Sequence, residues 1–138
     1  MTEEQTKKNV TFPKEEKLCS EKAIDRLFSE GDSFIAYPLR VVYCLYPQDD
    51  DANKQYPSVL ISVSKRKFKR AVKRNRVKRL VREVYRHNKD LFKELLIDKN
   101  KRIDIAFIYL KDELPVYTDI EKSMTKVLDQ LKSRIGDS

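Results

Sequence analysis

The stretch Ser58–Arg86, SVLISVSKRKFKRAVKRNRVKRLVREVYR, contains the change of pattern that decides the fold. Its first seven residues alternate between two faces, which predicts a β-strand over 58–64 with Val59, Ile61 and Val63 on one side. Further along, apolar residues recur at spacings of three and four, which predicts an amphipathic helix. The apolar stripe of this helix consists of Val77, Leu80, Val81, Val84 and Tyr85. The stretch is therefore interpreted as a strand followed by a helix.

The opposite side of this helix is basic. At 100° per residue, Asn75, Arg79, Arg82 and Arg86 lie within roughly 60° of one another. Arg76 and Lys78 flank them on either edge. The pattern predicts an apolar stripe that faces the core and a ridge of guanidinium groups that faces outward.

Charge is concentrated in this one segment. Residues 65–86 contain twelve Lys or Arg and one acid, Glu83, so the segment carries +11. The whole chain carries +8, which leaves −3 for the rest. Crowding like charge in this way costs self-repulsion unless a polyanion neutralises it, whereas a solvated helix face usually balances Lys with Glu. The segment therefore indicates nucleic-acid binding.

The remaining patterns predict a small α+β domain. Ser20 is placed to cap a short helix that ends near Gly31, and a long β-rich run covers 34–46. A turn or short helix over Lys89–Leu96 and a strand over Arg102–Leu110 follow. The pattern Thr118-Asp119-Ile120-Glu121 predicts a capping box. It would open a last helix with the stripe Ile120, Met124, Val127, Leu128, Leu131 and Ile135, ended by Gly136. The expected order is α-β-β-α-β-α, with one small central sheet packed by helices (an α/β sandwich).

Composition predicts the domain boundaries and the cellular compartment. We expect residues 1–11 to be a disordered tail and 12–138 to be a single RNA-binding domain. The chain shows no signal peptide and no apolar run long enough for a membrane span. Cys19 and Cys44 share no metal-ligand spacing with each other or with His87, the one histidine. These features are typical of a cytoplasmic protein without membrane contact.

The central motif resembles the ribonuclease P protein family. In this family a strand ending in Val-Ser-Lys precedes a helix that contains Arg-Asn-Arg, then Lys-Arg, then Arg-Glu. The strand ending here is Val63-Ser64-Lys65. The helix contains, in the same order, Arg74-Asn75-Arg76, Lys78-Arg79 and Arg82-Glu83. The similarity spans roughly residues 12–131. The turn Arg66–Arg70 departs from the family because it lacks Gly and is one residue longer.

The resemblance implies partners and roles. It implies a protein that binds the catalytic RNA subunit and the 5′ leader of precursor tRNA, while the RNA subunit performs the hydrolysis with Mg²⁺. No catalytic residue and no metal or cofactor bound by the protein alone are expected. It also implies a left-handed β-α-β crossover. The expected RNA-binding residues are Lys65, Arg66, Lys67, Lys69, Arg70, Lys73, Arg74, Asn75, Arg76, Lys78, Arg79, Arg82 and Arg86.

The leader is single-stranded, and such strands bind by stacking on aromatic rings beside a positive groove. The resemblance places Phe28 and Tyr43 there, with Ile24 as a weaker contact. Phe28 and Tyr43 also lie on stripes that suit a core equally well.

Three other functions compete. A nuclease that acts alone needs clustered carboxylates for metal ions, and the acids here are scattered. A ribosomal or ribosome-assembly protein would share the charge and the fold, and only the motif spacing speaks against it. A DNA-binding protein ranks third, because no recognition-helix pair or zipper is apparent.

Overall fold

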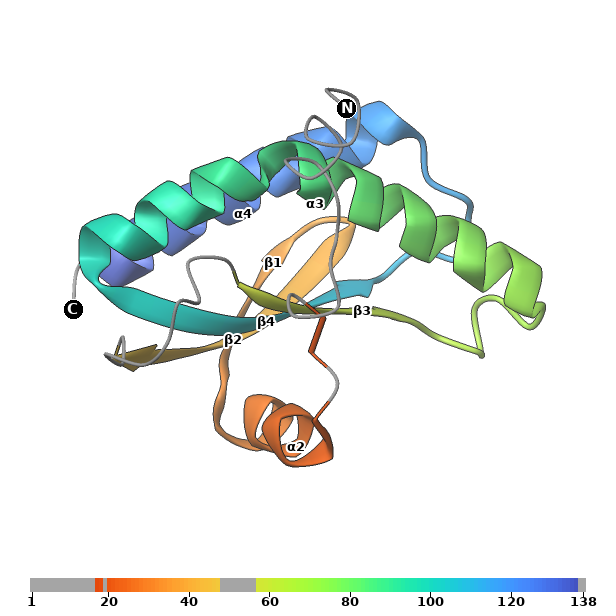
Figure 1. The fold of residues 1–138 in the computed structure, drawn as a ribbon. Helices are drawn as coiled ribbons and strands as arrows, with labels where there is room; N and C mark the ends of the chain where they lie inside the picture. Colours follow the sequence, from red (N-terminus) through yellow and green to blue (C-terminus); the bar gives the residue numbers. More distant parts are fainter. Residues whose placement is uncertain (1–16, 19, 48–56, 137–138) are drawn as a thin grey trace, which may run out of the picture.

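The computed structural model describes residues 17, 18, 20–47 and 57–136 (Figure 1). Its elements are α2 (Glu21–Glu30), β1 (Asp32–Ala36), β2 (Leu39–Pro47), β3 (Ser58–Val63), α3 (Ala71–Lys99), β4 (Lys101–Tyr109) and α4 (Tyr117–Gly136). The predicted α+β class with one small sheet is confirmed. The tail expected over residues 1–11 lies outside the described residues.

The sheet has four strands in the order β1-β2-β4-β3. β1 and β4 each pair with β2 in antiparallel fashion, and β3 pairs with β4 in parallel. Parallel neighbours need a crossover rather than a tight turn, and α3 supplies it. The β-α-β crossover is therefore present, while its left-handedness stays a prediction.

Helices cover both faces of the sheet (Figure 1). α3 and α4 lie side by side on one face, and α2 lies on the other. The larger core lies under α3 and α4 and contains both predicted stripes, with Leu80 only partly buried. The smaller core lies under α2 and joins Leu18 and Leu27 to Val42 and Ala106. The rotations of α3 and α4 about their axes were therefore predicted correctly from apolar spacing.

The expected single strand over 34–46 is wrong, because this run forms a hairpin. β1 and β2 are joined at Tyr37-Pro38, whose peptide bond is cis. Buried positions change from even numbers, as at Ala36, to odd numbers, as at Leu39. Pro38 has no N–H to give to a ladder, so it belongs at a turn rather than inside a strand.

Two helix boundaries also differ from prediction. α3 runs unbroken to Lys99, because Phe92, Leu95 and Leu96 continue its buried stripe. The separate turn or short helix expected over Lys89–Leu96 is therefore wrong. Asn100, in the left-handed conformation with φ 53°, ends it.

α4 begins at Tyr117, one residue before the predicted cap. The N–H groups of Asp119 and Ile120 donate to the carbonyl of Val116 (3.2 and 3.4 Å), so Thr118 lies inside the first turn and is not the cap. None of the described helices combines the length and the apolar character needed to cross a membrane.

α2 begins and ends as predicted. Ser20 is its N-cap, with Oγ accepting from the N–H of Ala23 (3.4 Å). Gly31 ends it for a reason of space, since its φ of −73° suits any residue. A Cβ at this position would lie 2.3 Å from the carbonyl oxygen of Leu27 and 2.9 Å from that of Tyr43. Glycine therefore lets the helix end pass close to β2.

Gly31→Ala should destabilise the protein by about 1–3 kcal/mol, because backbone atoms must move to admit the methyl group. Urea unfolding followed by circular dichroism measures the change. Ser29→Ala, at an exposed site two residues earlier, is the control and should change stability by less than about 0.5 kcal/mol. Equal stability of the two variants would show that the contact at Gly31 is not tight.

Candidate nucleic-acid interface

The turn between β3 and α3 is held by one apolar anchor. Phe68 is buried, with its ring 6.2 Å from that of Tyr109, and its N–H donates to the carbonyl of Ser64 (3.1 Å). The Oγ of Ser64 accepts from the N–H of Arg66 (3.1 Å). With Phe68 turned inward, five expected RNA-binding side chains of this turn are exposed: Lys65, Arg66, Lys67, Lys69 and Arg70.

Arg74 has a structural role that its place in the motif did not reveal. One terminal nitrogen of its guanidinium, Nη1, donates to the carbonyls of Phe68 and Lys69 (2.8 and 2.9 Å). This half-buried side chain therefore ties the first turn of α3 to the segment before it. Charge-assisted bonds of this kind are stronger than neutral ones. Arg74 shapes the basic turn in addition to any contact with RNA.

The basic ridge lies on α3 as predicted, opposite the buried side chains of Val77 and Val81. Lys73, Asn75, Arg76 and Arg79 are exposed, whereas Lys78, Arg82 and Arg86 are half-buried. Asn75 lies inside the helix rather than at its start, so it does not cap the helix.

The far end of the ridge contains its one acid. Glu83 forms an ion pair with Arg86 (3.1 Å) and contacts Nε2 of His87 (3.0 Å). His87 is exposed at the helix surface. Glu83 is paired with Arg86, so its negative charge offsets only one of the twelve positive charges of residues 65–86.

The start of α3 is unusual for a helix. Arg70 occupies the N-cap position without a side-chain hydrogen bond to the helix, and the first turn holds no acid. Helices ordinarily place Ser, Thr, Asp or Asn at this position and acids in the first turn. Here the positive end of the helix dipole adds to the charge of Lys69, Arg70 and Lys73.

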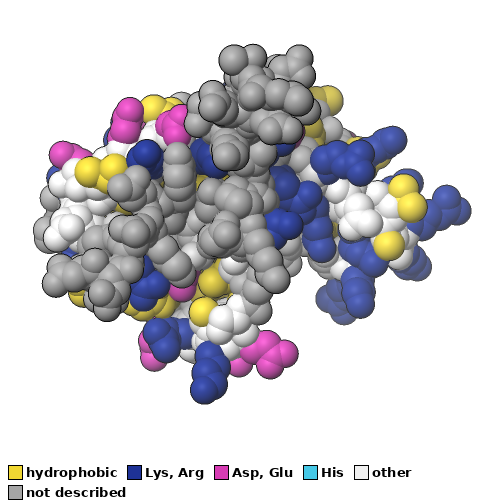
Figure 2. Space-filling model, viewed as in Figure 1, with side chains coloured by type: hydrophobic (Ala, Val, Ile, Leu, Met, Phe, Trp, Pro, Cys, Tyr) yellow, Lys and Arg dark blue, Asp and Glu magenta, His cyan; other side chains and the backbone are white. Residues whose placement is uncertain are grey.

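Positive charge gathers at one end of the molecule. Figure 2 shows most Lys and Arg side chains of this view in its right-hand part, where Figure 1 places the N-terminal half of α3. Asp and Glu appear mainly in the left-hand part and around α2. Positive charge is therefore concentrated in one part of the folded molecule as well as in one segment of the sequence.

The structure separates the three expected leader contacts. Ile24 and Phe28 lie on α2, where Phe28 is 48% exposed and Ile24 is half-buried. Tyr43 does not join them, because strand parity turns it to the opposite face of the sheet. There it is 4% exposed and packs edge-on against Phe34 (5.9 Å). The structure therefore corrects the expected stacking role of Tyr43, because a ring buried in the core presents no face to a base.

Sequence reasoning missed an open strip on the α2 face of the sheet. Arg40 pairs with Ile108 across β2 and β4, and Ile108 pairs with Ser62 across β4 and β3. Ile108 and Ser62 are half-buried and Arg40 is exposed, because α2 packs nearer the other end of β2. This row leads from the α2 side toward the basic turn. The alternation in β2, β3 and β4 was the signal that could have revealed it.

A second missed feature lies beside α2. The guanidinium of Arg102 lies over the ring of Tyr46 (4.6 Å to the centroid), and that of Arg26 is 5.9 Å from the same centroid. Burial raises the pKa of the Tyr46 hydroxyl, and the nearby Arg26 guanidinium opposes that shift. The α2 face therefore has cations of its own. Among the described residues no cluster of three His, Cys, Asp or Glu is placed to hold a metal ion.

The known proteins whose sequences match this chain carry the same description. The family model described as Ribonuclease P matches residues 12–132. The ribonuclease P protein component of Porphyromonas gingivalis is 45% identical over 125 residues, covering 91% of this chain and 89% of that protein. The ribonuclease P protein component of Chlorobaculum tepidum is 30% identical over 137 residues, covering 95% and 87%.

Solved structures agree on the fold. A Staphylococcus aureus RNase P protein, a mutant with defective mRNA degradation activity, has a TM-score of 0.62 at 24% identity, covering 86% of this chain and 90% of that one. A further structure of the RNase P protein from Staphylococcus aureus has a TM-score of 0.55 at 24% identity, covering 88% and 93%. The fold agrees with these matches, since it has the four-stranded sheet and a basic helix that crosses between two parallel strands. The chain belongs to the ribonuclease P protein family.

Proposed function

We propose that this chain is the protein subunit of ribonuclease P that binds the catalytic RNA and the 5′ leader of precursor tRNA, and so promotes 5′ maturation. One observation supports this most strongly. The twelve cations of residues 65–86 form a continuous turn and helix surface with a single acid, Glu83, and that acid is paired within the helix. No observation favours the ribosomal alternative.

The catalytic RNA is proposed to bind the ridge and the turn before it. Arg76 and Arg79 are exposed, and guanidinium forks bind phosphate through two parallel hydrogen bonds. The start of α3 supports this, because uncapped N–H groups and the helix dipole favour an anion. A helix that lacks its own cap and acid is well suited to take a phosphate in their place.

The leader is proposed to cross the α2 face. Phe28 is an exposed aromatic on this face, and Ile24 lies one turn before it. The open row of Arg40, Ile108 and Ser62 continues toward Lys65. A single strand following this row would meet one stacking ring, a shallow apolar strip and then cations.

Hydrolysis is proposed to come from the RNA subunit and its Mg²⁺. Metal-ion cleavage of a phosphodiester requires carboxylates gathered around the ions. The surface proposed to face RNA instead gathers cations, and Glu83 is engaged by Arg86 and His87. The protein's part is to neutralise phosphates so that RNA and substrate approach with less repulsion.

Reconstitution with a bacterial ribonuclease P RNA tests the proposal. The protein should lower the Mg²⁺ concentration needed to cleave precursor tRNA, because its cations replace part of the ionic screening. Its affinity for the RNA should fall on the order of a thousandfold between about 50 and 200 mM salt. A protein that binds the RNA without any effect on cleavage would argue against a role in ribonuclease P.

Removing the exposed arginines should weaken RNA binding without unfolding the protein. Arg76→Ala with Arg79→Ala should reduce affinity about a hundredfold or more, because each charged hydrogen bond is worth about 1.5–3 kcal/mol. Lys122→Ala with Lys126→Ala removes the same charge from exposed sites on α4 and is the matched control. Arg74→Ala should lower both affinity and thermal stability, since it also releases the turn. Equal losses in the two double variants would mean that only net charge matters.

Phe28→Ala should weaken binding of precursor tRNA that has a leader of several nucleotides, by about 1–3 kcal/mol for one lost base stack. Binding of tRNA without a leader should stay unchanged, which separates stacking from general damage. Ile97→Ala, at the exposed far end of α3, is the control for loss of an exposed apolar side chain. If leader length makes no difference in the Phe28 variant, the leader does not use this ring.

A further inference from the structure

Three connections that are distant in sequence meet at one end of the sheet. They are the β1–β2 turn at Tyr37-Pro38, the turn 64–70 before α3 and the loop 110–116 before α4. The N–H of Leu110 donates to the carbonyl of Pro38 (2.8 Å), and the Nζ of Lys67 donates to the carbonyl of Leu110. These bonds join all three connections at a single residue, Leu110.

The loop 110–116 is held from below. Tyr109, whose ring packs on that of Phe68, donates its hydroxyl to the carbonyl of Glu113 (2.7 Å). Burial, together with the nearby Glu113 carboxylate, raises the pKa of Tyr109 to about 12, so the hydroxyl keeps its proton at neutral pH. The side chains on this loop are therefore presented from a constrained backbone.

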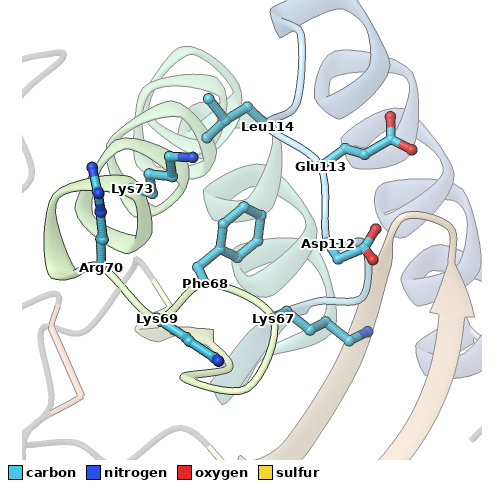
Figure 3. A pocket seen from close by; sticks show the side chains of 8 residues that line it. All are labelled: Lys67, Phe68, Lys69, Arg70, Lys73, Asp112, Glu113 and Leu114. Atoms are coloured by element: carbon cyan, nitrogen blue, oxygen red, sulfur yellow. The ribbon is translucent and has the colours of Figure 1, made fainter.

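Two depressions lie on either side of Lys67, with volumes of about 520 and 420 Å³, and both include Asp112 and Glu113. Figure 3 shows the larger one, with Phe68 at its centre, Arg70 and Lys73 on one side, Asp112 and Glu113 on the other, and Lys67 extending toward the side of Asp112. The smaller one adds Tyr37, Arg66 and Lys111. Each is of the size that small ligands occupy in proteins.

Opposite charges share these depressions without pairing. Among the described residues, no ion pair joins Asp112 or Glu113 to a cation. A ligand that carries both an anionic group and hydrogen-bond donors could contact both walls. A nucleotide has this combination: phosphate for the cations, and base N–H groups for the carboxylates.

Tyr37 supplies the remaining element. Its side chain is 58% exposed on the hairpin turn, and the Nζ of Lys111 lies 5.5 Å from its ring centroid. Single exposed aromatics are common on protein surfaces. A ring at a depression beside Arg66, Lys67 and Lys111 is a different case, because stacking rings with adjacent cations are how single-stranded nucleic acids are bound.

We propose that this end of the sheet binds one nucleotide of single-stranded RNA. Its base stacks on Tyr37, its phosphates lie against Arg66 and Lys111, and Asp112 or Glu113 accepts hydrogen bonds from the base. Guanine fits the carboxylates best, because its N1–H and N2–H groups form a fork that matches two oxygens. The inference rests on the proposed RNA-binding function. The site is separate from Ile24 and Phe28, since α2 packs near Cys44, toward the opposite end of β2.

The test uses the absence of tryptophan from the chain. Tyr37→Trp introduces a single indole whose fluorescence a stacked base quenches, at a site exposed enough to accept the larger ring. The ligands are the pentanucleotides UUGUU and UUUUU. Leu91→Trp, at an exposed position some five turns of α3 beyond Lys73, is the matched control. Circular dichroism confirms that both variants fold.

Saturable quenching in the Tyr37→Trp variant but not in the Leu91→Trp variant, about tenfold tighter for UUGUU than for UUUUU, is the expected result. Adding Asp112→Asn and Glu113→Gln to the Tyr37→Trp variant should abolish that preference. Quenching without any preference would overturn the carboxylate contact. No quenching in a variant that still binds ribonuclease P RNA would overturn the site and leave the proposed function standing. Failure to bind any RNA would reject both.

Fluorescence of the same Tyr37→Trp variant also shows which RNA supplies the nucleotide. Quenching on addition of the catalytic RNA alone assigns the nucleotide to the RNA subunit. Quenching only when precursor tRNA joins the reconstituted complex assigns it to the substrate.

Discussion

The packing of α3 on the sheet is the interaction on which the rest of the structure depends. Val77, Val81, Val84 and Tyr85 are fully buried, so the rotation of the helix about its axis is set by its apolar side. Arg76 and Arg79 then face outward because no other side of the helix remains for them. Burial of large apolar side chains, about 1.5–3 kcal/mol each, offsets the repulsion among crowded cations. The core thus holds in place a surface that would otherwise repel itself.

The same helix connects β3 to β4, so the basic turn is part of the crossover and not an appendage. Phe68 anchors this turn to Tyr109 at the end of β4, and Arg74 ties it to the first turn of the helix. The cations are consequently presented from a backbone constrained at both ends. A constrained surface loses less conformational entropy when it binds than a flexible basic tail would lose.

Local pattern accounted for most of the fold. Spacing predicted the stripes of α3 and α4 and the faces of β3, because each depends on neighbours in sequence. It failed at Tyr37-Pro38, where one continuous strand was expected and a hairpin lies, and at Lys89, where polar residues concealed a continuing helix. The candidate site was less accessible to the sequence than the fold. The outward ridge followed from spacing, but the bonds from Arg74 to Phe68 and Lys69 depend on the path of the turn. Tyr43 was placed by resemblance, although its parity with Leu39 and Val41 put it on the core face.

The short segment before α2 has a consequence for how the free protein behaves. Lys17 forms a parallel bridge with Val59, and the N–H of Leu18 donates to the carbonyl of Val59 (2.8 Å). β3 is an edge strand of the sheet, and an open edge can recruit a strand from another chain. By occupying part of that edge, Lys17 and Leu18 hinder such self-association. A chain made before its RNA partner is available is in this way guarded against aggregation by its own backbone.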